Sequence, residues 1–434
     1  MKPDGSGVAP GLAEEWQFDA PTKTWTFTLR ANAQFRDGTP VTSADVVFSA
    51  DIWKNGPNFG NSYARIETVE APDPQTVKFV LSEPDLNFEA VIAASIAGVV
   101  PKDFGGKSED DFYTKPIGAG AYKVDSWSAG GKIELSRNQH FYGSKTAGPN
   151  SLTLDVVADD NERAIMFESG DADIVEYVPA TATARYQSNE LNELDPSQIS
   201  HVSLNVNMAP FDDINIRKAV AAAIDYKSIV RGAYDGKATV PTGLIPPNLP
   251  RYAPPSNAYF TTDVDAAKKL LNGTSAENGV TTEIIYDAGV ESDALAAQIV
   301  IEDLAKIGIT VKATGLETAA FLDRAFGADA PMVLWTFGAV SPDVIDPVNW
   351  ISGTGWLFSG QDTAKLIEQS GAYATSSDDA SAKKIIEEIQ NEAINDAAAI
   401  ALAQFNVRHA VKPSISMTAA PWGLYYYDQL SSNG

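Results

Sequence analysis

The sequence contains no cysteine, only three histidines, and no uninterrupted run of roughly 18 apolar residues. The absence of cysteine excludes disulfides, thiolate metal sites and cysteine nucleophiles. His140, His201 and His409 are far apart in the chain and form no His-x-x-x-His pair, so we expect no metal site. Without a longer apolar run, nothing in the sequence is predicted to span a membrane.

Positive charge is also scarce, because 32 Lys and Arg residues stand against 57 Asp and Glu, giving a net charge of −25. Such a charge repels phosphate backbones, so we expect no nucleic-acid partner. It also argues against docking on an anionic membrane through a basic patch. The 434 residues are too many for one core and predict two or three domains.

Motifs of catalysis are missing as well. The sequence has no Gly-x-Ser-x-Gly elbow, and its one Ser-x-x-Lys match, Ser381–Lys384, lies among charges at a predicted helix start. Acidic pairs such as Asp159-Asp160 show no spacing that identifies a glycosidase. No nucleophile with its base can be assigned, so the chain is predicted not to be an enzyme and to need no cofactor. A secreted hydrolase is kept as a remote alternative.

What the sequence does contain is a strand, a turn and a helix over residues 12–48. Trp25, Phe27 and Leu29 alternate with polar residues, which is the pattern of a half-buried strand. A turn follows, and Thr42 is the predicted N-cap of a helix with Asp45 at its third position.

Two further segments carry strong local patterns. Over Phe211–Asp225, Asp212 or Asp213 is predicted to cap a helix whose buried stripe includes Ile216 and Val220. Later in the chain, alternation and spacing predict a strand, a helix ended by a glycine, and a second strand, which is a βαβ crossover with parallel pairing. Its parts are Thr282–Tyr286, Ser292–Ile307, Gly308 and Ile309–Ala313. Ser376–Leu402 is predicted to be one long helix, followed by a strand at Phe405–Val407.

Together, these segments closely resemble the peptide/nickel/oligopeptide class of extracytoplasmic solute-binding proteins, which deliver ligands to ABC importers. The resemblance runs from about Val8 to the C-terminus and includes Lys115–Val124, Ile133–Tyr142 and Asn161–Ile174. It implies an α/β fold with two lobes of the type II periplasmic-binding-protein kind and an additional buttressing domain. It also implies that the chain is trimmed at its N-terminus, and that Arg217 and Asp225, in the Phe211–Asp225 element, are residues of the fold.

The resemblance further implies a domain division and a hinge. The extra domain would be 1–116, lobe I would be 117–199 with 405–434, and lobe II would be 200–404. The chain would cross between lobes near 201–206 and 404–407, and two short extended crossovers make a hinge. Val202, Leu204 and Phe405 are its predicted residues.

The ligand is expected between the lobes, next to a specificity segment at Met332–Asp343. Peptide-binding members of the family have an aspartate here that pairs with the ligand ammonium, but in this sequence the position is Val340. Asp343 or Asp346 is the possible substitute.

Aromatic residues near this segment favour a second ligand class, because aromatic faces stack on sugar rings. Trp335, Phe337, Trp350 and Trp356 are either cleft platforms or, for some of them, core residues. The remaining predicted ligand neighbours are Gly338, Tyr286, Gly118 and Gly120, although a tight turn also accounts for the last two.

The sequence thus predicts an extracytoplasmic receptor for an oligopeptide or dipeptide, with an oligosaccharide as the alternative ligand. Its expected partner is an ABC transporter permease, and it is expected to be a monomer. The expected location is the periplasm, or the cell surface through a lipid anchor that the chain does not contain.

Overall fold

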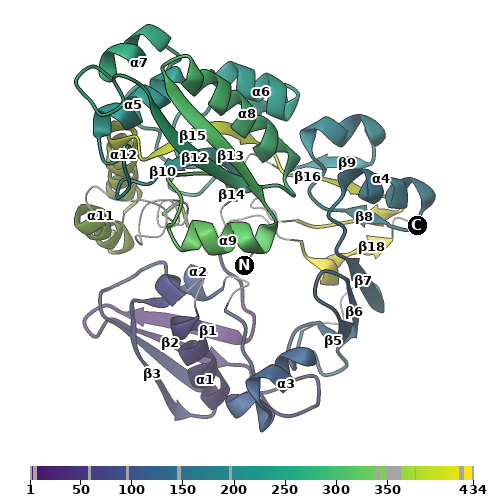
Figure 1. Cartoon of the computed structure of the whole chain (residues 1–434). Coiled ribbons are helices and arrows are strands. Elements are labelled where there is room, and N and C mark those ends of the chain that lie inside the picture. Colours follow the sequence, from purple (N-terminus) through teal and green to yellow (C-terminus); the bar gives the residue numbers. More distant parts are fainter. Residues whose placement is uncertain are drawn as a thin grey trace. The chain divides into compact units, whose positions relative to one another are not determined.

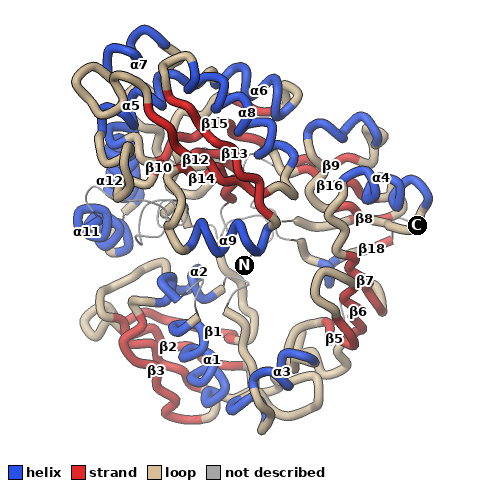
Figure 2. The backbone as a smooth tube through the Cα atoms, in the orientation of Figure 1, coloured by secondary structure: helices blue, strands red, loops and turns tan. Residues whose placement is uncertain are grey.

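The computed structural model describes residue 2 and residues 7–56, 60–93, 97–143, 148–194, 198–338, 343–345, 347, 363–376, 378–419 and 425–432 (Figures 1 and 2). The chain forms two units, one of Met1–Ala158, Lys412–Ala420 and Leu424–Gly434, the other of Asp159–Val411 and Pro421–Gly423. The predicted division into 1–116, 117–199 with 405–434, and 200–404 remains a prediction. Within the described ranges, no helix combines the length and apolar character that a bilayer crossing requires.

The first unit contains a four-stranded antiparallel sheet in the order β1-β2-β4-β3, with helix α1 packed on it (Figure 1). The bounds are β1 Ala13–Asp19, β2 Thr24–Leu29, α1 Ser43–Asn55, β3 Ile66–Asp73 and β4 Thr76–Leu81. The alternation predicted for β2 is confirmed, because Trp25, Phe27 and Leu29 are buried in one core. The helix start is confirmed too, since the Asp45 carboxylate accepts hydrogen bonds from Thr42 N at 2.7 Å and Thr42 Oγ1 at 2.8 Å.

The remainder of this unit consists of short helices and small antiparallel sheets, β5-β6-β7 and β17-β18. Their bounds are α2 Phe88–Ile92, α3 Glu109–Thr114, β5 Tyr122–Trp127, β6 Lys132–Arg137, β7 Ser151–Asp155, β17 Ile415–Ser416 and β18 Ser431–Ser432. The turn after β2 binds both β5 and the loop before it, because Arg36 N donates to Gly118 O at 3.0 Å and the Arg36 guanidinium donates to Val124 O of β5.

The second unit is dominated by a six-stranded mixed sheet in the order β11-β15-β10-β14-β12-β13. Its strands are β10 Gln198–Leu204, β11 Ala238–Thr239, β12 Val280–Asp287, β13 Ile309–Leu316, β14 Met332–Gly338 and β15 Ala399–Phe405. Strand β12 pairs in parallel with β13 and β14, which confirms the predicted crossover through α8 (Glu291–Ala305). Gly308 lies before β13 with φ 85°, a conformation that glycine adopts without steric cost.

Helices cover both faces of this sheet. Ile284 and Leu334 pack into a core with α5, α6 and α8, whereas their neighbours Ile285 and Val333 pack with α9. Because successive strand residues point to opposite faces, these two clusters define two helical layers. The bounds are α5 Ile214–Ala223, α6 Tyr226–Tyr234, α7 Val264–Leu270, α9 Thr318–Phe326, α11 Thr363–Ala374 and α12 Asp379–Asp396.

The Arg217 motif is confirmed as part of the fold. Asp213 caps α5 by accepting from Asn215 N at 2.8 Å, and Arg217 is only 1% exposed. Its guanidinium donates to Phe211 O at 2.8 Å, to Asp396 O at 3.0 Å and to Asp396 Oδ1 at 2.5 Å. The motif therefore joins α5 to the end of α12.

The long helix predicted over Ser376–Leu402 is wrong at its C-terminal end. Helix α12 ends at Asp396, Ala397 has φ 53°, and Ala399–Phe405 forms β15, which pairs with β10. The alanines and the leucine of this stretch favour a helix locally, but the sheet buries six of its seven residues and supplies the backbone partners.

A smaller antiparallel sheet, β8-β16-β9, completes the second unit. It comprises β8 Ile174–Val175, β9 Leu191–Glu193 and β16 Arg408–Val411, with helix α4 Asp160–Ser169 before β8 and the 3₁₀ helix η3 Ala180–Arg185 after it. Strand β9 leads into β10 and β15 leads into β16, so the chain passes twice between the two sheets.

Candidate ligand-binding site

Four strands of the six-stranded sheet end at one edge. Strands β12, β13 and β14 are parallel, and β15 has the same direction because β14 and β15 both pair antiparallel with β10. We call this the carboxyl edge and define it by the strand ends Asp287, Leu316, Gly338 and Phe405. Open α/β sheets bind ligands beyond the carboxyl ends of their strands, so this edge is the candidate site.

Two of the predicted ligand neighbours are at this edge. Tyr286 is the penultimate residue of β12, and its ring lies so close to Gly315 that a Cβ there would be 3.1 Å from it. Gly338 ends β14 opposite Gln198, and a Cβ at Gly338 would collide with the Gln198 amide. The glycines therefore let the tyrosine and the glutamine occupy the edge.

Sequence reasoning missed a pair of buried carboxylates beside the edge. Asp287 accepts a hydrogen bond from Gly289 N at 2.8 Å, and Asp293, in the first turn of α8, accepts one from Thr336 Oγ1 at 2.9 Å. Burial raises the pKa of Asp293 to about 7, against the lowering effect of the Thr336 bond, and the Asp287 charge adds to the rise. The sequence does contain a pattern that points to this pair, because Asp-x-Gly-x-x-x-Asp, residues 287–293, directly follows the first strand of the predicted crossover.

Sequence reasoning also missed the loop that follows β8. Tyr177 has φ 55°, which is strained for a residue with a side chain, and it is 54% exposed. Burial raises the pKa of the neighbouring Glu176 carboxyl. A few residues on, Thr181 Oγ1 donates to Glu291 Oε2 at 2.7 Å, so the segment after this loop contacts the first turn of α8. An exposed aromatic ring on strained backbone is a frequent feature of ligand sites.

The two chain passages are joined by a buried arginine. Arg408 Nε donates to Glu193 Oε1 at 2.7 Å and its Nη2 donates to Lys237 O at 2.9 Å, while Asn406 Nδ2 donates to Glu193 Oε2 at 3.0 Å. Burial by itself raises the pKa of Glu193, but the hydrogen bond and charge of Arg408 hold it below its ordinary value. The end of β9 and the start of β16 are thereby fixed to each other.

The three predicted hinge residues lie in different settings. Val202 and Leu204 are fully buried inside β10, which is bonded to β14 and β15 on its two sides. Phe405 is the last residue of β15, and its ring centroid is 4.7 Å from that of Tyr234. Only Phe405 therefore lies directly at a passage between the sheets.

The specificity segment is described only in part. Trp335 packs edge-on against Phe321 and Phe326 of α9, with ring centroids 5.5 and 5.8 Å away. Phe337 is a strand residue of β14, and Asp343 lies beside Tyr373, whose pKa is raised by burial and then by the Asp343 charge. The other predicted members of this segment, Val340, Asp346, Trp350 and Trp356, are outside the described residues.

The last two predicted neighbours, Gly118 and Gly120, belong to the first unit. Gly118 O accepts from Arg36 N, and Gly120 O accepts from Asn138 Nδ2 at 2.9 Å. Both glycines thus hold the loop before β5 through their carbonyl groups.

His201 gives a first test of the geometry at this sheet. It is fully buried opposite Trp335, and burial lowers its pKa from 6.5 to about 4. The folded state resists a proton that the unfolded chain accepts, so this histidine should cost about 3 kcal/mol of stability as the pH falls from about 6.5 to about 4. We expect His201→Gln to reduce this loss of stability when the free energy of unfolding in urea is measured at a series of pH values. The control variant His140→Gln, at an exposed position, should show the same loss as the wild type. An equal pH dependence of stability in both variants would contradict the burial of His201.

An α/β sheet with helices on both faces, four strands that end at one edge and two chain passages to a second sheet fit a receptor for small solutes, but the same features occur in other α/β proteins. Comparison with known proteins identifies the family. The chain belongs to the bacterial extracellular solute-binding proteins, family 5, whose family model matches residues 7–358.

Individual relatives agree with this assignment. Over 433 residues the chain is 28% identical to the probable D,D-dipeptide-binding periplasmic protein DdpA of Escherichia coli K12, covering 94% of this chain and 81% of the relative. It is 26% identical over 370 residues to the dipeptide-binding protein of the same organism, with coverages of 77% and 69%. The solved structure of AgaA from A. tumefaciens R10 in complex with agropinic acid superimposes with a TM-score of 0.89 at 25% identity, covering 98% of this chain and 90% of that one. The predicted family and the α/β type II periplasmic-binding-protein fold are confirmed.

Proposed function

We propose that this protein captures a dipeptide or short oligopeptide and delivers it to an ABC transporter permease. The observation that carries the proposal is the match along 94% of the chain to a relative named for D,D-dipeptide binding. The site supports it, because Asp287 ends β12 and Glu291 begins α8, so two carboxyl groups lie beside the carboxyl edge, where a peptide ammonium group would find a charge-assisted partner. The overall charge of −25 attracts the same kind of group.

The capture step in this proposal is a closure of two lobes on the ligand. The passages from β9 to β10 and from β15 to β16 serve as the hinge, with Arg408 and Glu193 keeping them together. A ligand shifts the equilibrium only by its preference for the closed form, and about 5.5 kcal/mol takes a 1:99 population to 99:1. The closed form is then the one that the permease recognises.

The cellular setting follows from the same proposal. The protein acts outside the cytoplasm, in the periplasm or at the cell surface through a lipid anchor. It works as a monomer and catalyses no reaction.

A sugar-containing ligand is the second candidate. The AgaA structure holds agropinic acid, so this fold accepts ligands other than peptides. Tyr286 supplies an aromatic ring at the carboxyl edge, and Tyr177 is an exposed aromatic residue of the loop after β8. Trp335 supports this alternative less than its position in the sequence suggested, because its ring packs against α9.

A thermal-shift screen separates the two candidates. Protein purified without refolding is first checked by native mass spectrometry for a carried ligand, and is then screened with di- to pentapeptides and with oligosaccharides. A ligand at about 100 times its Kd should stabilise the protein by about 2.7 kcal/mol. Asp287→Asn should weaken a peptide hit while Asp265→Asn, on the exposed start of α7, leaves it unchanged. Stabilisation by sugars alone would sink the peptide proposal.

A further inference from the structure

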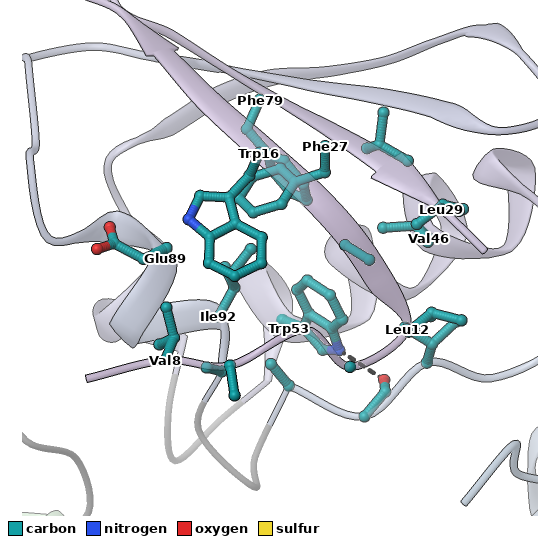
Figure 3. A pocket seen from close by; sticks show the side chains of 18 residues that line it. Val8, Leu12, Trp16, Phe27, Leu29, Val46, Trp53, Phe79, Glu89 and Ile92 are labelled. Atoms are coloured by element: carbon teal, nitrogen blue, oxygen red, sulfur yellow. Dashed lines mark hydrogen bonds between the residues drawn. The ribbon is translucent and has the colours of Figure 1, made fainter. Parts of the chain in front are cut away.

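The first unit contains an apolar cavity of about 390 Å³ (Figure 3). Its wall is formed by the four-stranded sheet, α1, α2, the segment before β1 and residues 97–99. Four aromatic side chains contribute, those of Trp16, Phe27, Trp53 and Phe79. The last three belong to the buried core, so the cavity reaches deep into the unit. Its size is within the range of small-molecule sites.

The charge of the described part of the wall is negative. Among the described residues that line the cavity, Glu89 of α2 is the only one with an ionisable side chain. The indole N–H of Trp53 is already used, because it donates to Gly98 O at 2.9 Å (Figure 3). Trp53 therefore offers a ligand its ring rather than a hydrogen bond.

We propose that this cavity binds an organic monocation with an aromatic or alkyl body, an amine or a quaternary ammonium compound. The faces of Trp16 and the other rings carry negative potential and attract a cation, most strongly when both are removed from water. The Glu89 carboxylate complements the charge, and the described residues of the wall include no lysine or arginine. An anion would be repelled by Glu89 and by the net charge of −25.

This inference goes beyond the transport function. The cavity lies in the four-stranded sheet unit, whereas the carboxyl edge belongs to the second unit. A ligand here would therefore be bound in addition to the transported solute, and its binding can fail or succeed independently of peptide capture.

The test uses three probes of related shape in isothermal titration with the whole chain. These are benzyltrimethylammonium, its neutral carbon isostere neopentylbenzene, and the anion phenylacetate. We expect saturable one-to-one binding of the cation and none of the anion. Glu89→Gln should weaken binding of the cation about tenfold and change the affinity for the neutral probe by no more than about twofold. Glu83→Gln, on the exposed loop after β4, is the matched control and should change neither.

A second variant tests the location. Ile92→Trp places a larger side chain in the cavity wall and should abolish binding of the cation while peptide capture is retained. No saturable binding of benzyltrimethylammonium, or equal affinities in Glu89→Gln and wild type, would overturn the proposal. Retained cation binding in a folded Ile92→Trp variant would overturn it as well.

Discussion

Replacing Arg217 with alanine should lower the free energy of unfolding by about 3–5 kcal/mol. Arg217 is buried and donates to Phe211 O and to both the backbone and the carboxylate of Asp396. Burial raises the pKa of Asp396 even with Arg217 beside it, so removing the guanidinium leaves a carboxylate that is poorly solvated. The alanine also leaves a void between α5 and the end of α12. Urea unfolding followed by circular dichroism measures the loss.

Two variants make this result specific. Arg231→Ala removes an exposed arginine from the neighbouring helix α6 and should cost less than about 1 kcal/mol. The double variant Arg217→Ala/Asp396→Ala should be less destabilised than the sum of its single changes, because the two side chains form one pair. A loss below about 1 kcal/mol in Arg217→Ala would show that the pair does not hold these helices together.

The second large effect concerns pH and Asp293. The folded protein keeps the Asp293 proton up to about pH 7, whereas the unfolded chain releases it near 3.8. The stabilisation that the Asp293 carboxyl contributes to the folded state is therefore fully present below about pH 4, and it is lost as the pH rises through about 7. Asparagine imitates the neutral acid and does not titrate. The free energy of unfolding of Asp293→Asn should consequently rise relative to that of the wild type as the pH increases, by a total on the order of 4 kcal/mol.

Urea unfolding at a series of pH values across this window tests the prediction. Asp265→Asn, at an exposed position, should follow the wild type at every pH. The slope from Asp293 is opposite in sign to the slope expected from His201, so each variant is compared with the wild type at the same pH. A pH-independent difference between Asp293→Asn and wild type would mean that this carboxyl is not buried as described.

Much of the fold could be predicted where local chemistry and tertiary structure agree. The alternation in β2, the cap at Asp213 and the crossover through α8 each combine a local signal with burial of the same residues. The family resemblance was sound for the same reason, since several such segments occurred in order along the chain.

Prediction failed where the sheet overrides local preference. Ala399–Phe405 has helix-forming residues and no alternation, because a strand buried on both faces needs none. The set of site residues predicted from the sequence was incomplete for a related reason. The pKa of Asp293 depends on burial among distant segments, and the strained backbone of Tyr177 is a property of its loop rather than of its side chain. Neither is encoded in a short motif.

The central proposal, a receptor that closes on a small solute, is tested most directly by small-angle X-ray scattering. The unliganded protein and the protein saturated with the ligand from the thermal-shift screen are measured under identical conditions. Closure predicts a smaller radius of gyration and a shorter maximum dimension in the liganded sample. Identical scattering curves with a ligand that binds tightly and stoichiometrically would contradict the account.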